Sequence, residues 1–424
     1  MNILNKIENY ILQKKNKLKI SSKDVKNGDV FIALKGKRFH GNKFIDASIQ
    51  NGAKFIITDN KNFKKNEKIL YVRNINIYLK NLAIVKRNKY KGKVIGITGS
   101  AGKTTLKETL AFFLKKNYLI SFSIKSYNNE LGVLISLLNL DLKSEFSIFE
   151  IGTNNFGEIK YLTSLIKPSE IFITNIQSTH LQNFKSKNNI AKEKSDIFLL
   201  KYNNQRKKLY LNITSKEEKI LINKAIKEKK LKVIRIDKYS KNYFIKKILP
   251  YKNYYSVFFY INRKIVVLNF STLIEFRLNN LLFCFAFFCE NSLKIKTISE
   301  QFKYLKPVNG RGLIHKINFY KKKLSIIDES YNANPDTMLQ SINYFQNIKK
   351  PNNKKILVLG NMNELGDKSI NLHFNLLQKL DKHIFKFVIL SGEFFKISIK
   401  KLNKPKNEYI YIQNNKEIMN YLKK

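Results

Sequence analysis

The sequence predicts an α/β protein of three domains, and three observations lead to this fold class. The chain has 424 residues, 43% of them hydrophobic, so it can bury several cores. Strand-like apolar runs alternate with helix-like segments, which is typical of parallel sheets covered by helices. A glycine-rich turn at 99–102 joins one strand to a helix, as in P-loop-type domains. We expect a small α/β domain at 1–90, a central parallel-sheet domain at 91–306 and a Rossmann-like domain at 307–424.

The first expected domain begins with an amphipathic segment. It continues with a strand-like run at 30–36, a polar loop at 38–44, a helix-like segment at 45–53 and a second strand-like run at 54–59. Gly36 and Gly41 bracket the polar loop, which could approach a ligand. Taken alone, this region indicates no chemistry.

The glycine-rich turn has the composition of a phosphate-binding loop. After the apolar strand 93–98, the glycines allow a tight turn in which successive N–H groups point at one anion. A lysine then supplies charge for the β/γ-phosphates, a threonine supplies a hydroxyl for Mg²⁺, and the following helix supplies its positive end. The spacing is G-x-x-G-K-T-T, shorter than the strict pattern, so a glycine turn with a chance lysine is the alternative. The expected loop residues are Gly99, Ser100, Ala101, Gly102, Lys103, Thr104 and Thr105.

Two further strand-like runs end in polar residues. Glu150 ends the run at 146–150 and Asn175 follows the run at 171–173. Open α/β sheets bind ligands at the carboxyl ends of their strands, so Glu150 is a candidate Mg²⁺ ligand, with a solvated strand-end glutamate as the alternative. His180 follows shortly after, but a lone histidine is more often structural, and Mg²⁺ does not favour imidazole.

The rest of the chain is expected to complete the second and third domains. Short β-like runs at 232–236, 255–261 and 264–270 suggest an antiparallel flap, and the apolar stretch 277–295 a buried helix. The segment 305–312, with one proline and two glycines, marks the next boundary. Beyond it, strands and helices alternate again and suggest a second parallel sheet, where Asp328 at a strand end could bind ribose hydroxyls.

Charge and cysteine content bound the class of protein. The formal net charge is +49, which raises the possibility of a nucleic-acid-binding ATPase. The lysines are spread over the whole chain together with Asn and Ile, which favours biased coding composition instead. The two cysteines, Cys284 and Cys289, lie in one apolar segment and are expected to be buried thiols in a reducing compartment. With no signal peptide or long apolar span, we expect a soluble, cytoplasmic protein.

With these parts in order, the sequence resembles the Mur ligases, within them most closely the branch that joins D-alanyl-D-alanine to UDP-N-acetylmuramoyl-tripeptide. The resemblance covers nearly the whole chain. Its most specific stretches are GITGSAGKTTLKE, SYNNELGV, FEIGTNNFGEI, TNIQSTHLQNFKS, IAKEKSDIF, PVNGRG, DESYNANPDTM and VLGNMNELGD. The resemblance implies a UDP-binding first domain, a central ATPase domain and a third domain that closes over the site.

The resemblance also implies the reaction. ATP phosphorylates the terminal carboxylate of the tripeptide, the amine of D-Ala-D-Ala attacks the acyl phosphate, and phosphate leaves, giving a precursor of cell-wall peptidoglycan. The implied cofactors are ATP and two Mg²⁺ ions. The implied partners are the two substrates, with no nucleic acid and no membrane insertion, and the expected state is a monomer.

Site residues follow from the matching motifs. Lys103 matches the lysine at the β/γ-phosphates, and Thr104 and Glu150 match ligands of one Mg²⁺. His180 matches a metal-ligand histidine, and Lys194 a lysine that becomes a carbamate and bridges to the second Mg²⁺, with Lys192 as the register alternative. The nucleotide contacts are Asn280, Arg311 and Asp328, and the peptide side of the site is matched by Asn128, Asn129, Asn332 and Asn334.

Several positions depart from the family pattern. In the first domain, Ser21, Ser22 and Lys23 stand where the family has its uridine-side motif. In the central domain, Phe276 and Arg277 replace a usual His-Asn pair. In the third domain, Glu329 and Asn361 each replace an aspartate. The third domain is expected to be shortened. The alternatives are therefore a degenerate relative that binds without turnover, or another Mur or folylpolyglutamate-type ligase. The sequence does not distinguish diaminopimelate from lysine in the tripeptide.

Overall fold

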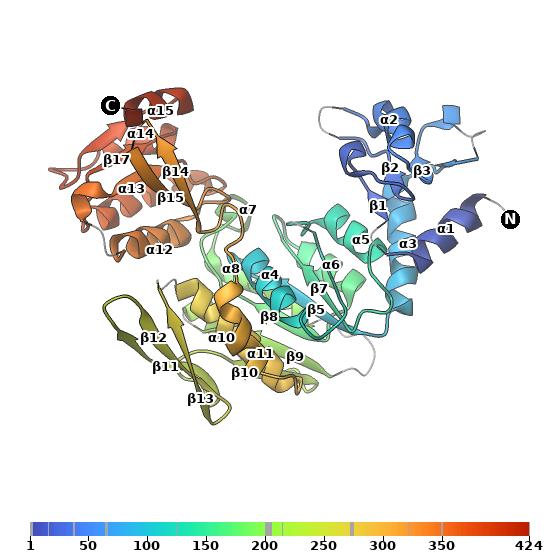
Figure 1. Ribbon diagram of the computed structural model, residues 1–424, viewed down its shortest axis with the longest axis horizontal. Coiled ribbons are helices and arrows are strands. Elements are labelled where there is room, and N and C mark those ends of the chain that lie inside the picture. The colour runs from blue at the N-terminus through green and yellow to red at the C-terminus, as the bar shows by residue number, and fades with distance from the viewer. Residues whose placement is uncertain are drawn as a thin grey trace.

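The structure, a computed structural model, consists of three α/β units that follow one another along the chain (Figure 1). The first and third units lie on opposite sides of the central one, and the two chain ends lie on opposite sides of the molecule. The described residues are 3–15, 17–36, 39–63, 67–124, 126–199, 206–213, 215–271, 275–320, 322–348 and 351–423.

The first unit is a four-stranded parallel sheet with buried central strands. In β2 (Val30–Ile32), Val30 and Ile32 enter one hydrophobic core while Phe31 enters another. Parallel sheets covered on both faces require strands of this kind. The strands and helix predicted from the sequence are present. The order is β1-β2-β3-β4, with β1 (Leu18–Lys19), β3 (Phe55–Thr58), β4 (Ile69–Tyr71), α1 (Ile3–Gln13), α2 (Ile45–Gln50) and α3 (Ile75–Lys89).

The central unit contains a six-stranded parallel sheet with the order β10-β9-β8-β5-β7-β6. Strand β5 (Lys93–Thr98) lies between β8 and β7, so the chain turns to opposite sides of β5 at its carboxyl end. Such a switch point is where open α/β sheets bind ligands. The other strands are β6 (Ile120–Phe122), β7 (Phe146–Glu150), β8 (Glu170–Ile173), β9 (Lys207–Leu211) and β10 (Leu231–Arg235). The helices are α4 (Lys103–Leu114), α5 (Glu130–Leu138), α6 (Glu158–Ile166), α7 (Leu181–Phe184), α8 (Lys187–Leu199) and α9 (Lys216–Ala225).

A three-stranded antiparallel sheet, of strands β11, β12 and β13, and a buried helix complete the central unit. The run at 232–236, predicted to join this flap, instead forms β10 of the parallel sheet, because it pairs in parallel with β9. Helix α10 (Glu275–Glu290) packs its aromatic residues on the sheet, where Phe172 and Tyr210 stack at 4.4 Å. Cys284 is buried and Cys289 partly buried, both as free thiols whose pKa is raised by burial. The bounds are β11 (Tyr243–Pro250), β12 (Tyr255–Ile261), β13 (Lys264–Phe270) and α11 (Lys296–Gln301).

The third unit combines an antiparallel hairpin with a three-stranded parallel sheet. Strand β15 (Lys322–Asp328) pairs with β14 (Leu313–Phe319) and does not join the parallel sheet as the alternation had suggested. The parallel strands are β16 (Ile356–Leu359), β17 (Phe387–Leu390) and β18 (Tyr409–Tyr411), and the helices are α12 (Pro335–Gln346), α13 (Ser369–Leu380), α14 (Glu393–Ile399) and α15 (Asn415–Lys423). Among the described residues, we find no helix with the length and apolar character needed to cross a membrane.

A buried lysine joins the first unit to the central one. Lys86, in the last turn of α3, is fully buried, and its Nζ donates to the main-chain carbonyls of Ile11 at 2.8 Å, Lys14 at 2.9 Å and Leu138 at 2.5 Å. The last turns of α1 and α5 thus direct their unpaired carbonyls, the negative ends of the helices, at one ammonium group. Burial lowers the pKa of Lys86 to about 8, while Asp141 acts to raise it. We call this contact the first joint.

Candidate active site

The turn after β5 requires glycine at one position and favours it at a second. Gly99 has φ +143°, and a Cβ there would lie 1.9 Å from Oγ1 of Thr174 on the neighbouring strand end. Gly102 has φ +80° and caps the N-terminus of α4 in the left-handed region. The tight turn therefore brings the start of α4, and the positive end of its dipole, to the carboxyl edge of the sheet.

The segment after β8 holds this loop in place. The N–H groups of Ser100 and Ala101 both donate to Asn175, to its main-chain O at 3.0 Å and its Oδ1 at 2.9 Å. Thr174 Oγ1 donates to the Ala101 carbonyl at 2.5 Å. These two N–H groups were predicted to face an anion, and that part of the prediction is wrong. The donors left for an anion are the first-turn N–H groups of α4, which have no partner within the helix.

Lys103 lies over the turn that it follows. Its Nζ donates to the carbonyl of Gly99 at 2.8 Å and is 3.4 Å from that of Ser100. Burial lowers the pKa of Lys103, Glu150 raises it and Arg311 lowers it further. The side chain therefore brings a positive charge directly to the mouth of the loop.

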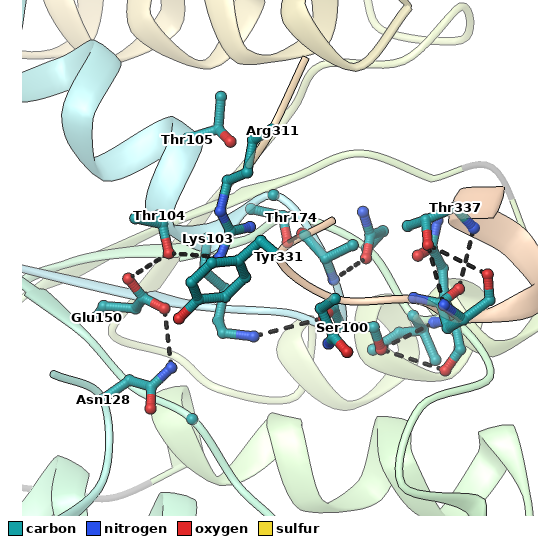
Figure 2. Close-up of a pocket in the computed structure, with 18 of the residues that line it drawn as sticks. Ser100, Lys103, Thr104, Thr105, Asn128, Glu150, Thr174, Arg311, Tyr331 and Thr337 are labelled. Carbon is teal, nitrogen blue, oxygen red and sulfur yellow. Dashed lines mark hydrogen bonds between the residues drawn. The ribbon is translucent and has the colours of Figure 1, made fainter. Parts of the chain in front are cut away.

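Thr104 and Glu150 form the centre of the polar cluster in Figure 2. Thr104 Oγ1 donates to Glu150 Oε2 at 2.9 Å, and Asn128 Nδ2 donates to Glu150 Oε1 at 2.9 Å. Arg311 Nη2 reaches Thr104 Oγ1 at 3.1 Å from the segment that leads into the third unit. Glu150 is only 1% exposed. The expected loop threonine and strand-end glutamate therefore meet as a pair.

Two further predicted residues line the same cavity. Lys194 on α8 is 2% exposed, and its pKa is held well below the usual range by burial and by Lys103. His180 lies in the left-handed region at φ +52°, and burial lowers its pKa while Glu364 acts to raise it. The register alternative, Lys192, is exposed and lies outside the cavity lining. The intervening Glu193 is turned away and accepts N–H bonds from Gly157 and Ile159 at 2.8 Å each.

The third unit closes one side of the cavity. The Arg311 guanidinium lies 4.0 Å from the ring centre of Tyr331 (Figure 2). Asn334 is the N-cap of α12 and accepts from the N–H groups of residues 336 and 337 at 3.0 Å, so it has a structural function as well as a place in the lining. Asn129 caps α5 in the same way. Asn332 also lines the cavity but is exposed.

The cavity has a volume of about 420 Å³ and is lined by residues of the central and third units only, among those described. Asp328, predicted as a ribose contact, is outside the lining, and its carboxylate accepts from Ser330 N at 3.0 Å and Ser330 Oγ at 2.6 Å. Of the predicted residues, the lining contains Ser100, Ala101, Gly102, Lys103, Thr104, Thr105, Asn128, Asn129, Glu150, His180, Lys194, Asn280, Arg311, Asn332 and Asn334, but not Gly99.

Sequence reasoning missed several lining residues. Gln177 and Glu218 are buried beside the loop, and Glu218 belongs to a capping box that begins at Ser215, a signal readable from the sequence. Asn280 Nδ2 is buried with no hydrogen-bond partner among the described residues, which suits a ligand contact. The side chains of Phe276 and Arg277, which replace a family motif, lie outside the described residues.

The oxygen atoms that face each other in this cavity are of the kind that bind Mg²⁺. Hydroxyl and carboxylate oxygens, here Thr104 Oγ1 and Glu150 Oε2, are the hard ligands that this ion prefers. Within the described ranges, no group of three or more His, Cys, Asp or Glu side chains could hold a metal by itself. An ion at this pair would complete its coordination with phosphate oxygens and water, as Mg²⁺ commonly does.

The third unit contacts the segment 178–187 of the central unit around Glu364 and Asp336, and Lys368 Nζ also reaches the Lys185 carbonyl at 3.3 Å. Glu364 Oε2 contacts His180 Nδ1, and the main-chain carbonyl of Glu364 accepts from Gln182 N at 3.0 Å. Asp336 Oδ2 accepts from Ser178 N at 2.9 Å and lies 3.3 Å from Lys187 Nζ. We call these contacts the second joint. Together they fix the segment that carries His180 against the third unit.

Three family models match this chain. They are described as the Mur ligase middle domain, matching residues 97–288, the Mur ligase family catalytic domain, matching 16–86, and the Mur ligase glutamate ligase domain, matching 316–424. A UDP-N-acetylmuramoyl-tripeptide–D-alanyl-D-alanine ligase from Rickettsia prowazekii is 32% identical over 369 residues, covering 85% of this chain and 79% of its own length. The protein of that name from Buchnera aphidicola (subsp. Acyrthosiphon pisum) is 30% identical and covers 96% and 87%.

Solved structures show the same fold. MurF from Acinetobacter baumannii aligns with a TM-score of 0.80 at 24% identity, covering 96% of this chain and 86% of its own. The MurF ligase from Thermotoga maritima, solved with ADP, aligns with a TM-score of 0.73 at 24% identity and covers 97% and 96%. At these identities, the similarity shows that the arrangement of the three units is shared.

Proposed function

Since this chain belongs to the Mur ligase family, we propose that it joins D-alanyl-D-alanine to UDP-N-acetylmuramoyl-tripeptide at the expense of ATP. The observation that carries the proposal is the single cavity in which the loop lysine and the Thr104–Glu150 pair share a lining with the buried Lys194. The curated relatives that bear this name match over most of their length as well as most of this chain. The chain is proposed to act as a cytoplasmic monomer.

The first chemical step is phosphorylation of a carboxylate. A tripeptide carboxylate oxygen attacks the γ-phosphorus of ATP and ADP leaves, which converts an unreactive carboxylate into an acyl phosphate. Lys103 and the N-terminal end of α4 stabilise the negative charge on the transferring group, and Arg311 adds a second cation at the same edge. Bound Mg²⁺, held by Thr104 and Glu150, would neutralise phosphate charge. Asn128 keeps the Glu150 carboxylate in place by its hydrogen bond.

The second step is aminolysis. The amine of D-Ala-D-Ala attacks the acyl carbon, the C–O bond to phosphate breaks, and the amine loses a proton as the amide forms. The protein contributes mainly positioning, which is worth several kcal/mol when reacting atoms are held together. Tyr331, Asn332 and the start of α12 come from the third unit, on the side of the cavity where the incoming dipeptide is proposed to bind.

We propose that Lys194 carries a carbamate, as the family resemblance implies, and that two Mg²⁺ ions are used. A neutral amine adds to CO₂ and loses one proton, and the lowered pKa of the buried Lys194 favours the neutral amine. The product is an oxygen ligand, which replaces a cation that would repel a metal ion. His180 is proposed as a ligand on the same side of the cavity.

The test is phosphate release by the purified protein with ATP, Mg²⁺ and UDP-N-acetylmuramoyl-tripeptide, in the presence of D-Ala-D-Ala or D-Ala. The tripeptide is supplied with either diaminopimelate or lysine as its third residue. We expect turnover that requires the dipeptide, with a pentapeptide product identified by mass. Saturable binding of the UDP-tripeptide without turnover would instead indicate a degenerate relative, and turnover with a single amino acid another ligase of the superfamily.

A further inference from the structure

We propose that Glu364 of the third unit is a positioning residue: it holds the imidazole of His180 through Nδ1 and so presents Nε2 to the cavity. The proposal rests on the proposed function, which gives His180 the role of a metal ligand. It adds that the carboxylate that orients this ligand comes from a different unit of the fold.

The hydrogen-bonding chemistry of the two groups carries the argument. Glu364 Oε2 contacts His180 Nδ1, and His180 lines the cavity whereas Glu364 does not. A carboxylate can only accept, so Nδ1 must be the protonated nitrogen. In a neutral imidazole, Nε2 then keeps its lone pair for a ligand. A carboxylate behind a histidine ligand commonly fixes the tautomer and the ring orientation in this way.

The backbone on both sides of the contact supports a specific arrangement. His180 has φ +52° and Glu364 has φ +63°, so two non-glycine residues in the left-handed region meet across the boundary between units. This conformation is disfavoured for a residue that has a Cβ, and it persists where the surroundings fix it. The surroundings here include the bond from Gln182 N to the Glu364 carbonyl at 3.0 Å. The loop that carries Glu364 is thus docked by its main chain, which leaves the side chain to act on His180.

The geometry makes the orientation of His180 depend on docking of the third unit. His180 belongs to the central unit and precedes α7, which has only four residues. Nothing else described in the second joint contacts the imidazole, since Asp336 binds Ser178 N and Lys187. When the third unit is docked, the imidazole has one tautomer and one orientation. Without the Glu364 carboxylate, both tautomers become accessible.

The experiment reads the tautomer directly. The chain has five histidines, so ¹⁵N-histidine labelling gives a spectrum simple enough to assign His180 by its loss in His180→Gln. We expect the Nδ1–H form in the wild-type protein, a mixture in Glu364→Ala, and retention of the Nδ1–H form in Glu364→Gln, whose amide oxygen still accepts. The matched control is Lys368→Ala, which removes the contact from Lys368 Nζ to the Lys185 carbonyl at 3.3 Å without touching His180.

Metal affinity gives a second readout without turnover. With ADP present, Mn²⁺ binding measured by electron paramagnetic resonance should weaken by about 10- to 100-fold in Glu364→Ala and stay within about threefold in Lys368→Ala. The proposal is overturned if Glu364→Ala leaves the tautomer and the Mn²⁺ affinity unchanged. It is equally overturned if Lys368→Ala alters both to the same extent, because docking in general would then be responsible. Neither readout requires ligase activity, so failure of the pentapeptide assay in the wild-type protein is a separate result.

Discussion

The central unit is joined to its two neighbours in contrasting ways. At the first joint, Lys86 is fully buried and bonded to three carbonyls, and Asn139, 6% exposed, exchanges two hydrogen bonds with the main chain of Leu18. At the second joint, the side chains remain in contact with water: His180 and Glu364 are 23% and 56% exposed, and Asp336 and Lys187 are each 34% exposed.

This difference indicates that the first joint stabilises the folded chain, whereas the contacts of the second joint can change more easily. Buried polar groups are costly to separate because each is left without a partner, whereas exposed pairs exchange readily with water. We infer that the polar contacts of the first joint are the harder ones to separate, and that those of the second joint can be exchanged for water at smaller cost. The cavity lies on the adjustable side, since its described lining comes from the central and third units.

The largest expected effect tests whether the site is independent of both joints. Lys103→Ala should lower phosphate release by about 10³-fold or more, because the loop loses the charge that stabilises the transferring phosphoryl group. Its free energy of unfolding should change less than that of Lys86→Ala, since Lys103 takes part in neither joint and loses one bond, to the Gly99 carbonyl. Enzyme assays and chemical denaturation on the same preparation check this. A parallel loss of stability would mean that the site also holds the units together.

A substitution at the first joint should lower the stability of the protein and leave its turnover nearly unchanged. Lys86→Ala removes the donor for three buried carbonyls, and we expect the free energy of unfolding to fall by about 3 kcal/mol or more. Turnover per folded molecule should change by less than about twofold. Urea denaturation followed by activity at low denaturant gives both values. Unchanged stability would contradict the view that this joint is fixed.

The pH dependence of the free energy of unfolding gives a second test of the buried lysine at the first joint. The pKa of Lys86 is about 8 in the folded protein against 10.5 ordinarily, so between these values the unfolded chain binds more protons. Stability therefore rises with pH across this window, by up to about 3 kcal/mol from this group. Denaturation at pH 7.5 and 10.5 should show this rise in the wild-type protein and a smaller one in Lys86→Met. Equal pH dependence in both proteins would argue against a depressed pKa.

The smallest effect is expected at the second joint. Asp336→Asn keeps an acceptor for Ser178 N but loses the charge that faces Lys187. Because the pair is partly exposed, the unfolding free energy should fall by no more than about 1 kcal/mol. A modest rise in KM with little change in kcat would reflect easier undocking. A destabilisation as large as that of Lys86→Ala would remove the distinction between the joints.

Local patterns were enough to predict the elements that position the site. Strand β5, the glycine turn and α4 follow from neighbouring residues, and so does Glu150 at the end of β7. The N–H groups of Ser100 and Ala101 do not point at one anion as expected, because Asn175, 74 residues after Ala101, takes them up. A pattern of neighbouring residues cannot predict this contact with Asn175.

Long-range pairing also explains the other differences. Asp328 ends a strand as predicted, but β15 belongs to a hairpin, so its end is not at the ligand edge of a parallel sheet. The contact between His180 and Glu364 joins residues of two units, and no sequence interval predicts it. Apart from Asp328, the functional residues carried over from family motifs, Lys194 among them, line the cavity because those motifs already encode such tertiary contacts.

The turn at Gly99 also bears on how this sequence has changed. Only 16 glycines occur in 424 residues, in a chain whose composition is shifted toward lysine, and nine of them have positive φ. At Gly99 any side chain would collide with Thr174, so exchange is prevented by the backbone itself. Gly99 is therefore a position that a shift in composition could not replace, and it belongs to the loop under the cavity.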